Sequence, residues 1–179
     1  CTEAGIIVTN IAGSTSEEVS NHALSLLMAS ARELKRLDLA TTSGRWAEVY
    51  SRSILNRIYG ETVGIVGFGW IGRAMARKCN ALGMKVLIND PYVGEHLATE
   101  YGVEFVSKNE LLERSDYVTL HIPHLDGTHH FIDADALDRM KTSAYLINTA
   151  RGPVVDEIAL VTAVQSEQIA GAGIDVYEE

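Results

Sequence analysis

The sequence of 179 residues contains only two cysteines, Cys1 and Cys79. Two cysteines cannot build a disulfide framework or a cysteine-rich metal site, and their scarcity fits a reducing compartment. The chain also lacks any run of basic residues, and its formal net charge is -9. Nucleic acids and anionic membranes are bound through basic patches, so we expect neither of them as a partner.

Long apolar runs are missing as well. The longest nearly apolar stretch, at residues 23–31, is too short to cross a bilayer. The first ten residues carry neither the basic region nor the cleavage site of a secretory signal, so we expect a cytoplasmic protein. Because the chain begins with Cys1 instead of Met, we also expect it to be a piece of a longer protein.

From residue 62 onward, apolar runs alternate with segments of helical periodicity. The predicted strands are 62–67, 84–89, 103–106, 116–121, 144–148 and 170–176, and the predicted helices are 70–82, 95–101, 109–114, 133–140 and 156–167. The strands are continuously apolar, which is typical of a parallel sheet that helices cover on both faces. The sequence therefore predicts an α/β fold, a doubly wound parallel sheet of the Rossmann type with three αβα layers.

Local signals mark several helix ends in this half of the chain. Ser107 and Glu110 have the spacing of a capping box, and Asp133 is placed to cap the helix that follows it. Gly83 follows the helix at 70–82 as a C-terminal glycine would.

Residues 1–61 follow a different pattern. The segment GIIVTN at 5–10 could be the end of a strand, and Ser14 with Glu17 predicts a capping box for a long helix that reaches about Leu37. The apolar stripe of this helix consists of Val19, Ala23, Leu27, Ala31 and Leu34. We interpret residues 38–61, which hold Trp46 and Tyr59, as an arm or connector. We thus predict a hinge strand, helix and arm in 1–61 and a dinucleotide-binding domain in 62–179.

A glycine pattern, Gly67-x-Gly69-x-x-Gly72, leaves the first predicted strand and opens a predicted helix. In this context Gly67 permits a tight turn, Gly69 lets a pyrophosphate approach the backbone, and Gly72 lets the helix pack close to the strand. The N–H groups and the helix dipole at residues 69–72 favour an anionic ligand. The alternative is a purely structural turn.

An acidic residue, Asp90, follows the second predicted strand of this unit. A carboxylate there can accept hydrogen bonds from the ribose hydroxyls of a dinucleotide and would repel a 2′-phosphate. The pattern favours NAD over NADP as the cofactor. The alternative is a solvated turn residue before Pro91.

The stretch LINTARGP places a permanent cation, Arg151, directly after a buried strand and before Gly152-Pro153. Open α/β sheets bind ligands at the carboxyl ends of their strands, so a bidentate cation there could grip an anionic substrate. The alternative is a structural ion pair, because arginines are common at strand ends.

Five blocks of the sequence, together with GIIVTNIAGSTSEEVSNHALSLLMA, resemble the D-isomer-specific 2-hydroxyacid dehydrogenases, which include D-3-phosphoglycerate dehydrogenase. In chain order the blocks are TVGIVGFGWIGRAMA, VLINDPY, SDYVTLHIPHLDGTHHFI, MKTSAYLINTARGPVVDEIAL and IAGAGIDVYEE. The resemblance covers nearly the whole chain. It implies an NAD domain inserted in a substrate domain that this chain does not contain.

The resemblance also implies roles for individual residues. Arg151 would be the catalytic residue that holds the substrate carboxylate and carbonyl beside the cofactor. Trp70 and Ile71 would offer backbone to the pyrophosphate. The remaining cofactor contacts would come from His121, Pro123, Thr149, Ala150, Arg151 itself and Asp175, with Asp175 meeting the nicotinamide carboxamide.

Two departures from the family pattern stand out. The general acid/base histidine of the family and its glutamate partner align beyond Glu179, so we expect this chain to bind NAD without turning over substrate alone. Residues 20–22 read Ser-Asn-His where the family usually has Ala-Glu-His.

Four histidines, His121, His124, His129 and His130, lie within ten residues. We expect no metal site among them, since Pro123 interrupts any helix that would align them and no cysteine or carboxylate triad accompanies them in the sequence.

Two other functions compete with the dehydrogenase. One is an NAD-sensing interaction module like the transcriptional corepressors that share the fold, and the other is an NAD domain like that of S-adenosylhomocysteine hydrolase, which lacks the NTARGP block. The acidic charge favours the enzyme.

The substrate would be a small 2-hydroxy or 2-oxo acid. We also expect a homodimer through the long helix and the arm, because both would leave apolar surface exposed on a monomer.

Overall fold

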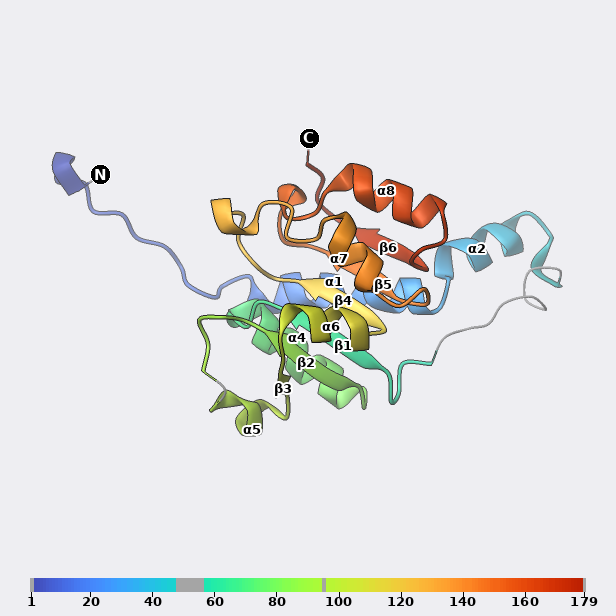
Figure 1. The fold of residues 1–179 in the computed structure, drawn as a ribbon, viewed down its shortest axis with the longest axis horizontal. Coiled ribbons are helices and arrows are strands. Elements are labelled where there is room, and N and C mark those ends of the chain that lie inside the picture. The colour runs from blue at the N-terminus through green and yellow to red at the C-terminus, as the bar shows by residue number, and fades with distance from the viewer. Residues whose placement is uncertain (1, 48–56, 95, 179) are drawn as a thin grey trace.

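Six parallel strands form one sheet at the centre of the chain (Figure 1). The computed structural model describes residues 2–47, 57–94 and 96–178. The strands are β1 (Thr62–Val66), β2 (Lys85–Asn89), β3 (Glu104–Phe105), β4 (Tyr117–Leu120), β5 (Tyr145–Asn148) and β6 (Gly171–Ile174). Their order is β3-β2-β1-β4-β5-β6, and every pair is parallel. This confirms the doubly wound sheet, with the order reversing between β1 and β4.

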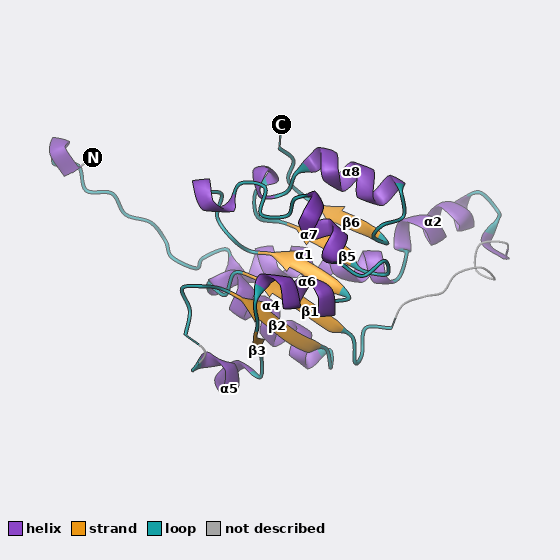
Figure 2. Cartoon of the chain, viewed as in Figure 1, coloured by secondary structure: helices purple, strands orange, loops and turns teal. Residues whose placement is uncertain are grey.

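Helices cover both faces of the sheet (Figure 2). In the described part of the chain the helices are α1 (Ser16–Ala31), α2 (Leu34–Thr42), α4 (Trp70–Ala81), α5 (Leu97–Tyr101), α6 (Lys108–Arg114), α7 (Ala134–Arg139) and α8 (Glu157–Gln165), of which α2 lies beside the sheet. Short 3₁₀ turns occur at η1 (Thr2–Ala4), η2 (Asp126–Thr128) and η3 (Gly152–Val154). Helices α6, α7 and α8 share one apolar cluster with the strands, and α1 and α4 share a second one on the other face.

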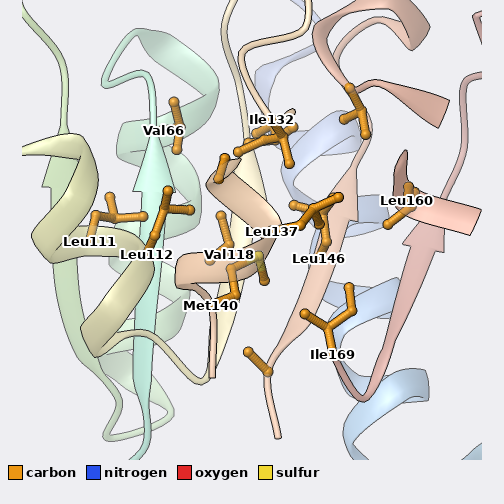
Figure 3. Packing of buried hydrophobic residues seen from close by; sticks show 14 of the residues in the cluster. Val66, Leu111, Leu112, Val118, Ile132, Leu137, Met140, Leu146, Leu160 and Ile169 are labelled. Carbon is orange, nitrogen blue, oxygen red and sulfur yellow. The ribbon is translucent and has the colours of Figure 1, made fainter. Parts of the chain in front are cut away.

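Side chains from the helices interlock with those of the central strands. On one face, Leu111 and Leu112 of α6 and Leu137 of α7 lie against Val118 and Leu146 of the sheet (Figure 3). All residues of β4 are buried, and so are four of the five in β1. Because both faces are covered, the central strands are apolar without alternation, as the sequence predicts.

Three of the predicted helix ends are found in the structure. The Ser107 hydroxyl accepts from the Glu110 amide at 3.3 Å, and the Glu110 carboxylate accepts from the Ser107 amide at 3.1 Å. Asp133 accepts from the Ala136 amide at 2.8 Å. Gly83 follows α4 with φ of 73°, a left-handed conformation that suits glycine.

The predicted long helix is wrong at both ends. It ends at Ala31, and Glu33, with φ of 49°, separates it from α2. The apolar stripe continues to Leu34, but the sheet does not, and Leu34 is 54% exposed. At the other end, Thr15 and not Ser14 precedes the helix, and no side chain caps it. The Glu17 carboxylate pairs instead with Lys78 and Arg77 of α4.

The rest of the N-terminal region also differs from the prediction. Residues 5–10 form no strand and are exposed, and they lead away from the sheet toward the N-terminus (Figure 1). The predicted arm begins as helix α2, and residues 48–56 lie outside the described part of the chain. The boundary at 61/62 stays a prediction, although α1 packs on β5 and β6 as part of the same layered unit.

The expectation that the apolar stripe of the long helix is exposed on a monomer is also wrong. Ala23, Leu27 and Ala31 are fully buried, because this face of α1 covers β5 and β6. Among the described residues, no helix is long and apolar enough to cross a membrane.

Candidate functional site: the carboxyl edge of the sheet

The sheet brings every sequence-predicted site residue to one edge. Since all strands run parallel, their carboxyl ends lie together, on both sides of the reversal between β1 and β4. The residues that follow these ends are Gly67, Gly69, Trp70, Ile71 and Gly72 after β1, Asp90 after β2, His121 and Pro123 after β4, Thr149, Ala150 and Arg151 after β5, and Asp175 after β6.

The three glycines of the turn have three different environments. Gly67 has φ of 93°, and a Cβ there would lie 2.7 Å from the carbonyl oxygen of His121. A Cβ on Gly72 would lie 2.1 Å from the carbonyl oxygen of Gly67. A Cβ on Gly69 would meet nothing within 4 Å. Gly67 and Gly72 are thus required by the fold itself, whereas Gly69 keeps an open space above the backbone.

The backbone amides of residues 69–72 belong to the same turn. Helix α4 begins at Trp70, and its first recorded backbone bond runs from the Arg73 amide to the Gly69 carbonyl at 3.0 Å. In the described part of the chain, no acceptor is recorded for the amides of residues 69–72. No acidic residue lies in the first turn of α4. Four free N–H groups at the positive end of a helix fit a diphosphate.

The conformation of the turn depends on two residues that the glycine pattern leaves unspecified. Phe68 is fully buried, with edge contacts to Tyr101 and Phe105 at centroid distances of 5.3 and 5.6 Å. Arg73 donates from Nε to the Phe68 carbonyl at 3.0 Å and lies over the Phe68 ring. Sequence reasoning missed both, although an aromatic residue between two glycines of an exposed turn is a usable signal.

Asp90 is half-buried and braces the same turn. One carboxylate oxygen accepts from the Phe68 amide at 2.7 Å and the other accepts from the Tyr92 amide at 2.8 Å. Each oxygen keeps a second lone pair, so hydroxyl groups can still donate to it. A hollow of about 540 Å³ lies beside Asp90 and is also lined by Glu110. Two carboxylates beside one hollow would repel a 2′-phosphate.

Two buried polar atoms at this edge have no hydrogen-bond partner among the described residues: Nδ1 of His121 and Oγ1 of Thr149. The two side chains follow the neighbouring strands β4 and β5. Burial lowers the pKa of His121 to about 4, so its imidazole is neutral near pH 7. Its Nε2 contacts Oγ1 of Thr119 at 3.1 Å. Unsatisfied buried polar atoms are rare, and here they fit a polar ligand at the strand ends.

The turn after β5 explains the composition of the NTARGP block. The side chain of Asn148 donates to the Arg151 carbonyl and accepts from the Ala150 amide, both at 3.0 Å. A Cβ on Gly152 would lie 1.7 Å from the carbonyl oxygen of Tyr177, so only glycine fits. Asn148 is another residue that sequence reasoning missed.

This turn presents the exposed side chain of Arg151 at the edge. Its guanidinium bonds only the neighbouring Ala150 carbonyl, at 2.5 Å, and among the described residues no carboxylate pairs with it. The alternative of a structural ion pair therefore has no support in this part of the chain.

The histidine cluster includes a carboxylate that the sequence did not reveal. His130 Nε2 lies 2.8 Å from the Glu178 carboxylate, and His129, His130 and Glu178 could in principle ligate one ion. However, the two rings stack at 4.0 Å with 21° between their planes. A ring nitrogen binds a metal within its own plane, so nearly parallel rings do not point at one ion. No observation tests the expectation that the histidines form no metal site, but the geometry of the two rings argues against such a site.

These features define a dinucleotide-binding domain, and comparison with known proteins gives its family. The model of the D-isomer specific 2-hydroxyacid dehydrogenase, NAD binding domain, matches residues 24–179, and the chain belongs to this family. It is 43% identical to a glyoxylate reductase of Korarchaeum cryptofilum over 99% of this chain and 54% of that protein. It is 35% identical to a D-3-phosphoglycerate dehydrogenase of Archaeoglobus fulgidus over 99% of this chain and 33% of that protein.

Solved structures agree with the family. A D-lactate dehydrogenase with NAD+ from Lactobacillus jensenii matches with a TM-score of 0.90 and 30% identity, over 99% of this chain and 53% of that one. The chain thus spans between a third and about half of the length of these relatives.

Proposed function

We propose that this chain holds NAD along the carboxyl edge of its sheet, as the cofactor domain of an enzyme that transfers hydride between NAD and a D-2-hydroxy acid or its 2-oxo acid. The observation that carries the proposal is the set of free amides at residues 69–72 beside Asp90. The unpartnered atoms of His121 and Thr149 lie at the same edge and support it.

Each residue at the edge then has a definite task. The amides of residues 69–72, including Trp70 and Ile71, bind the diphosphate, and Asp90 binds the adenosine ribose. His121 and Pro123 border the adenine side, while Thr149 and Ala150 flank the cofactor. Asp175 accepts from the nicotinamide carboxamide. Bound NAD would supply the hydride acceptor.

Arg151 gives the site its chemistry toward substrate. A guanidinium has parallel N–H donors that match a carboxylate and the adjacent oxygen of a 2-oxo acid. The hydrogen bond from the Asn148 side chain to the Arg151 carbonyl and the tight fit at Gly152 hold the backbone on both sides of Arg151. This preorganisation would orient the substrate for hydride transfer. The names of the relatives make glyoxylate and 3-phosphoglycerate the first substrates to test.

Calorimetry with NAD and NADH on the purified chain tests the cofactor half of the proposal. Measurable binding of both is the expected result, and no heat with either would contradict it. The catalytic half is tested on the whole protein: Arg151→Ala should lower kcat/KM for a D-2-hydroxy acid by about a thousandfold and leave NAD affinity within about threefold. An equal loss of NAD affinity would show that Arg151 acts through cofactor binding alone.

The named relatives are dehydrogenases and reductases, which favours the enzyme over a corepressor-like module.

We also propose a homodimer and a cytoplasmic location. With the α1 stripe buried, the support for a dimer is the apolar surface of α2 and of Tyr59 in the predicted arm.

A further inference from the structure

One histidine of α1 touches the candidate cofactor site from outside the sheet. Nε2 of His22 lies 3.1 Å from Oδ1 of Asp175, although 153 residues separate the two in sequence. An ionised carboxylate can only accept hydrogen bonds, so Nε2 must carry the proton and donate. Across the described residues, no hydrogen bond is recorded on the other oxygen, Oδ2. The carboxylate is thus held on one side and open on the other.

The packing of α1 fixes the distance between these two side chains. A Cβ on Gly173 would lie 3.1 Å from Cβ of Leu26 and 3.6 Å from Oγ of Ser30, so α1 approaches β6 closely at this glycine. Ala23 and Leu27, which belong to α1 and face the sheet, are fully buried. On the β6 side, the Asp175 amide donates to the Asn148 carbonyl at 3.0 Å. Both ends of the His22–Asp175 contact therefore sit on fixed backbone.

We propose that His22 is a positioning residue that holds the Asp175 carboxylate with Oδ2 directed at the nicotinamide carboxamide of NAD. The inference rests on the proposed function, since it requires Asp175 to meet the nicotinamide. Both side chains are about half exposed, so without a ligand the pair adds little to stability. Its effect is on ligand binding, because an aspartate held in one rotamer need not be ordered when the carboxamide arrives.

The test separates the nicotinamide end of the ligand from the adenosine end. Affinities for NAD and for ADP-ribose, which lacks nicotinamide, are measured by calorimetry on the 179-residue chain. His22→Leu removes the donor and should weaken NAD binding about fivefold to tenfold, with ADP-ribose unchanged. His22→Gln restores an N–H donor near the position of Nε2 and should keep NAD affinity within about twofold.

Two further variants control the measurement. Ser25→Ala lies one turn along α1, where the hydroxyl bonds only the Asn21 carbonyl of its own helix, and it should leave both affinities unchanged. Asp175→Ala should weaken NAD binding selectively, and adding His22→Leu to it should cause no further loss, because His22 acts only through Asp175.

The outcomes are distinct. If His22→Leu weakened the binding of NAD and of ADP-ribose equally, His22 would be a structural residue and the inference would be overturned. Additive losses of NAD affinity in the double variant would also overturn it, as would an unchanged NAD affinity in His22→Leu. If the unmodified chain bound neither ligand, the proposed function would fail, and this inference with it. Selective and non-additive losses, with rescue by His22→Gln, support it.

Discussion

At the scale of single residues, the site uses a few side chains for two purposes at once. Asp90 shows this most clearly, since it holds the Phe68 amide and also faces the proposed ribose position. A carboxylate already fixed by backbone amides loses little rotamer freedom when a ribose binds. The same bonds mean that changing Asp90 affects the turn as well as the ligand.

Asp90→Ala should weaken NAD binding about tenfold and narrow the preference for NAD over NADP, because the carboxylate that repels a 2′-phosphate is gone. Affinities for NAD and NADP by calorimetry check this. The free energy of unfolding should fall by about 1 kcal/mol as the two amides lose their acceptor. Unchanged affinities for both cofactors would remove Asp90 from the site.

His121 gives the protein a dependence of stability on pH. Burial lowers its pKa from 6.5 to about 4, so the unfolded chain takes up a proton at a higher pH than the folded one. Its contribution is therefore complete above about pH 6.5 and is lost as the pH falls toward 4. Full loss amounts to about 3 kcal/mol at most.

His121→Gln removes the titrating group and should flatten this part of the pH profile. Urea unfolding of both proteins at several values between pH 7 and 4 measures the difference between them. The two proteins share all their other titratable groups. Parallel curves of the free energy of unfolding against pH would therefore show that the buried imidazole does not cause the pH dependence.

At the scale of elements, sequence patterns succeeded where burial on both faces repeats. Strands β1, β2, β4 and β5 are continuous apolar runs, so their order along the chain and their parallel pairing could be predicted. The glycine turn and the site residues at the strand ends follow from that topology. The residues that sequence reasoning missed, Phe68 and Asn148, act through contacts that no spacing rule encodes.

The helix break at Glu33 could not be predicted for a physical reason. The apolar stripe of α1 keeps its helical spacing through Leu34, so periodicity alone continues the helix. The side chain of Leu34 is 54% exposed, so continuing the helix would bury little more of its apolar stripe, and no spacing rule encodes this property of the fold. The cluster of His130 and Glu178 was missed likewise, because the sheet brings together residues 48 positions apart.

Two of the three glycines in the turn after β1 provide a matched pair of variants. Gly72→Ala places a Cβ against the Gly67 backbone and should lower the free energy of unfolding by about 2–3 kcal/mol. Gly69→Ala meets no atom, with φ of -72° that alanine accepts, and should leave stability within about 0.5 kcal/mol. Its Cβ would occupy the proposed diphosphate space and weaken NAD binding about tenfold or more. Urea unfolding and calorimetry separate the two effects. Wild-type NAD affinity in Gly69→Ala would exclude this turn as the diphosphate site.

At the scale of the whole molecule, part of the exposed apolar surface lies on α2 and just before β1. Leu34 and Leu39 of α2 are 54% and 57% exposed, and Tyr59, which packs on Gly83, is 72% exposed. Helix α2 lies beside the sheet and not over it (Figure 1), and its two leucines are exposed. A second copy could cover them through an interface that repeats about a two-fold axis.

Leu39→Glu should therefore shift the chain from dimer to monomer, since a buried unpaired carboxylate at a dimer interface strongly disfavours association. Sedimentation velocity over a range of concentrations measures the change. Ile158→Glu is the matched control: this residue is 82% exposed on α8, a different helix, and its replacement should leave the mass unchanged. Because α2 lies away from the carboxyl edge of the sheet, NAD affinity should be the same in both variants. A monomeric unmodified chain at high concentration, or a dimer that Ile158→Glu alone disrupts, would place the interface elsewhere or remove it.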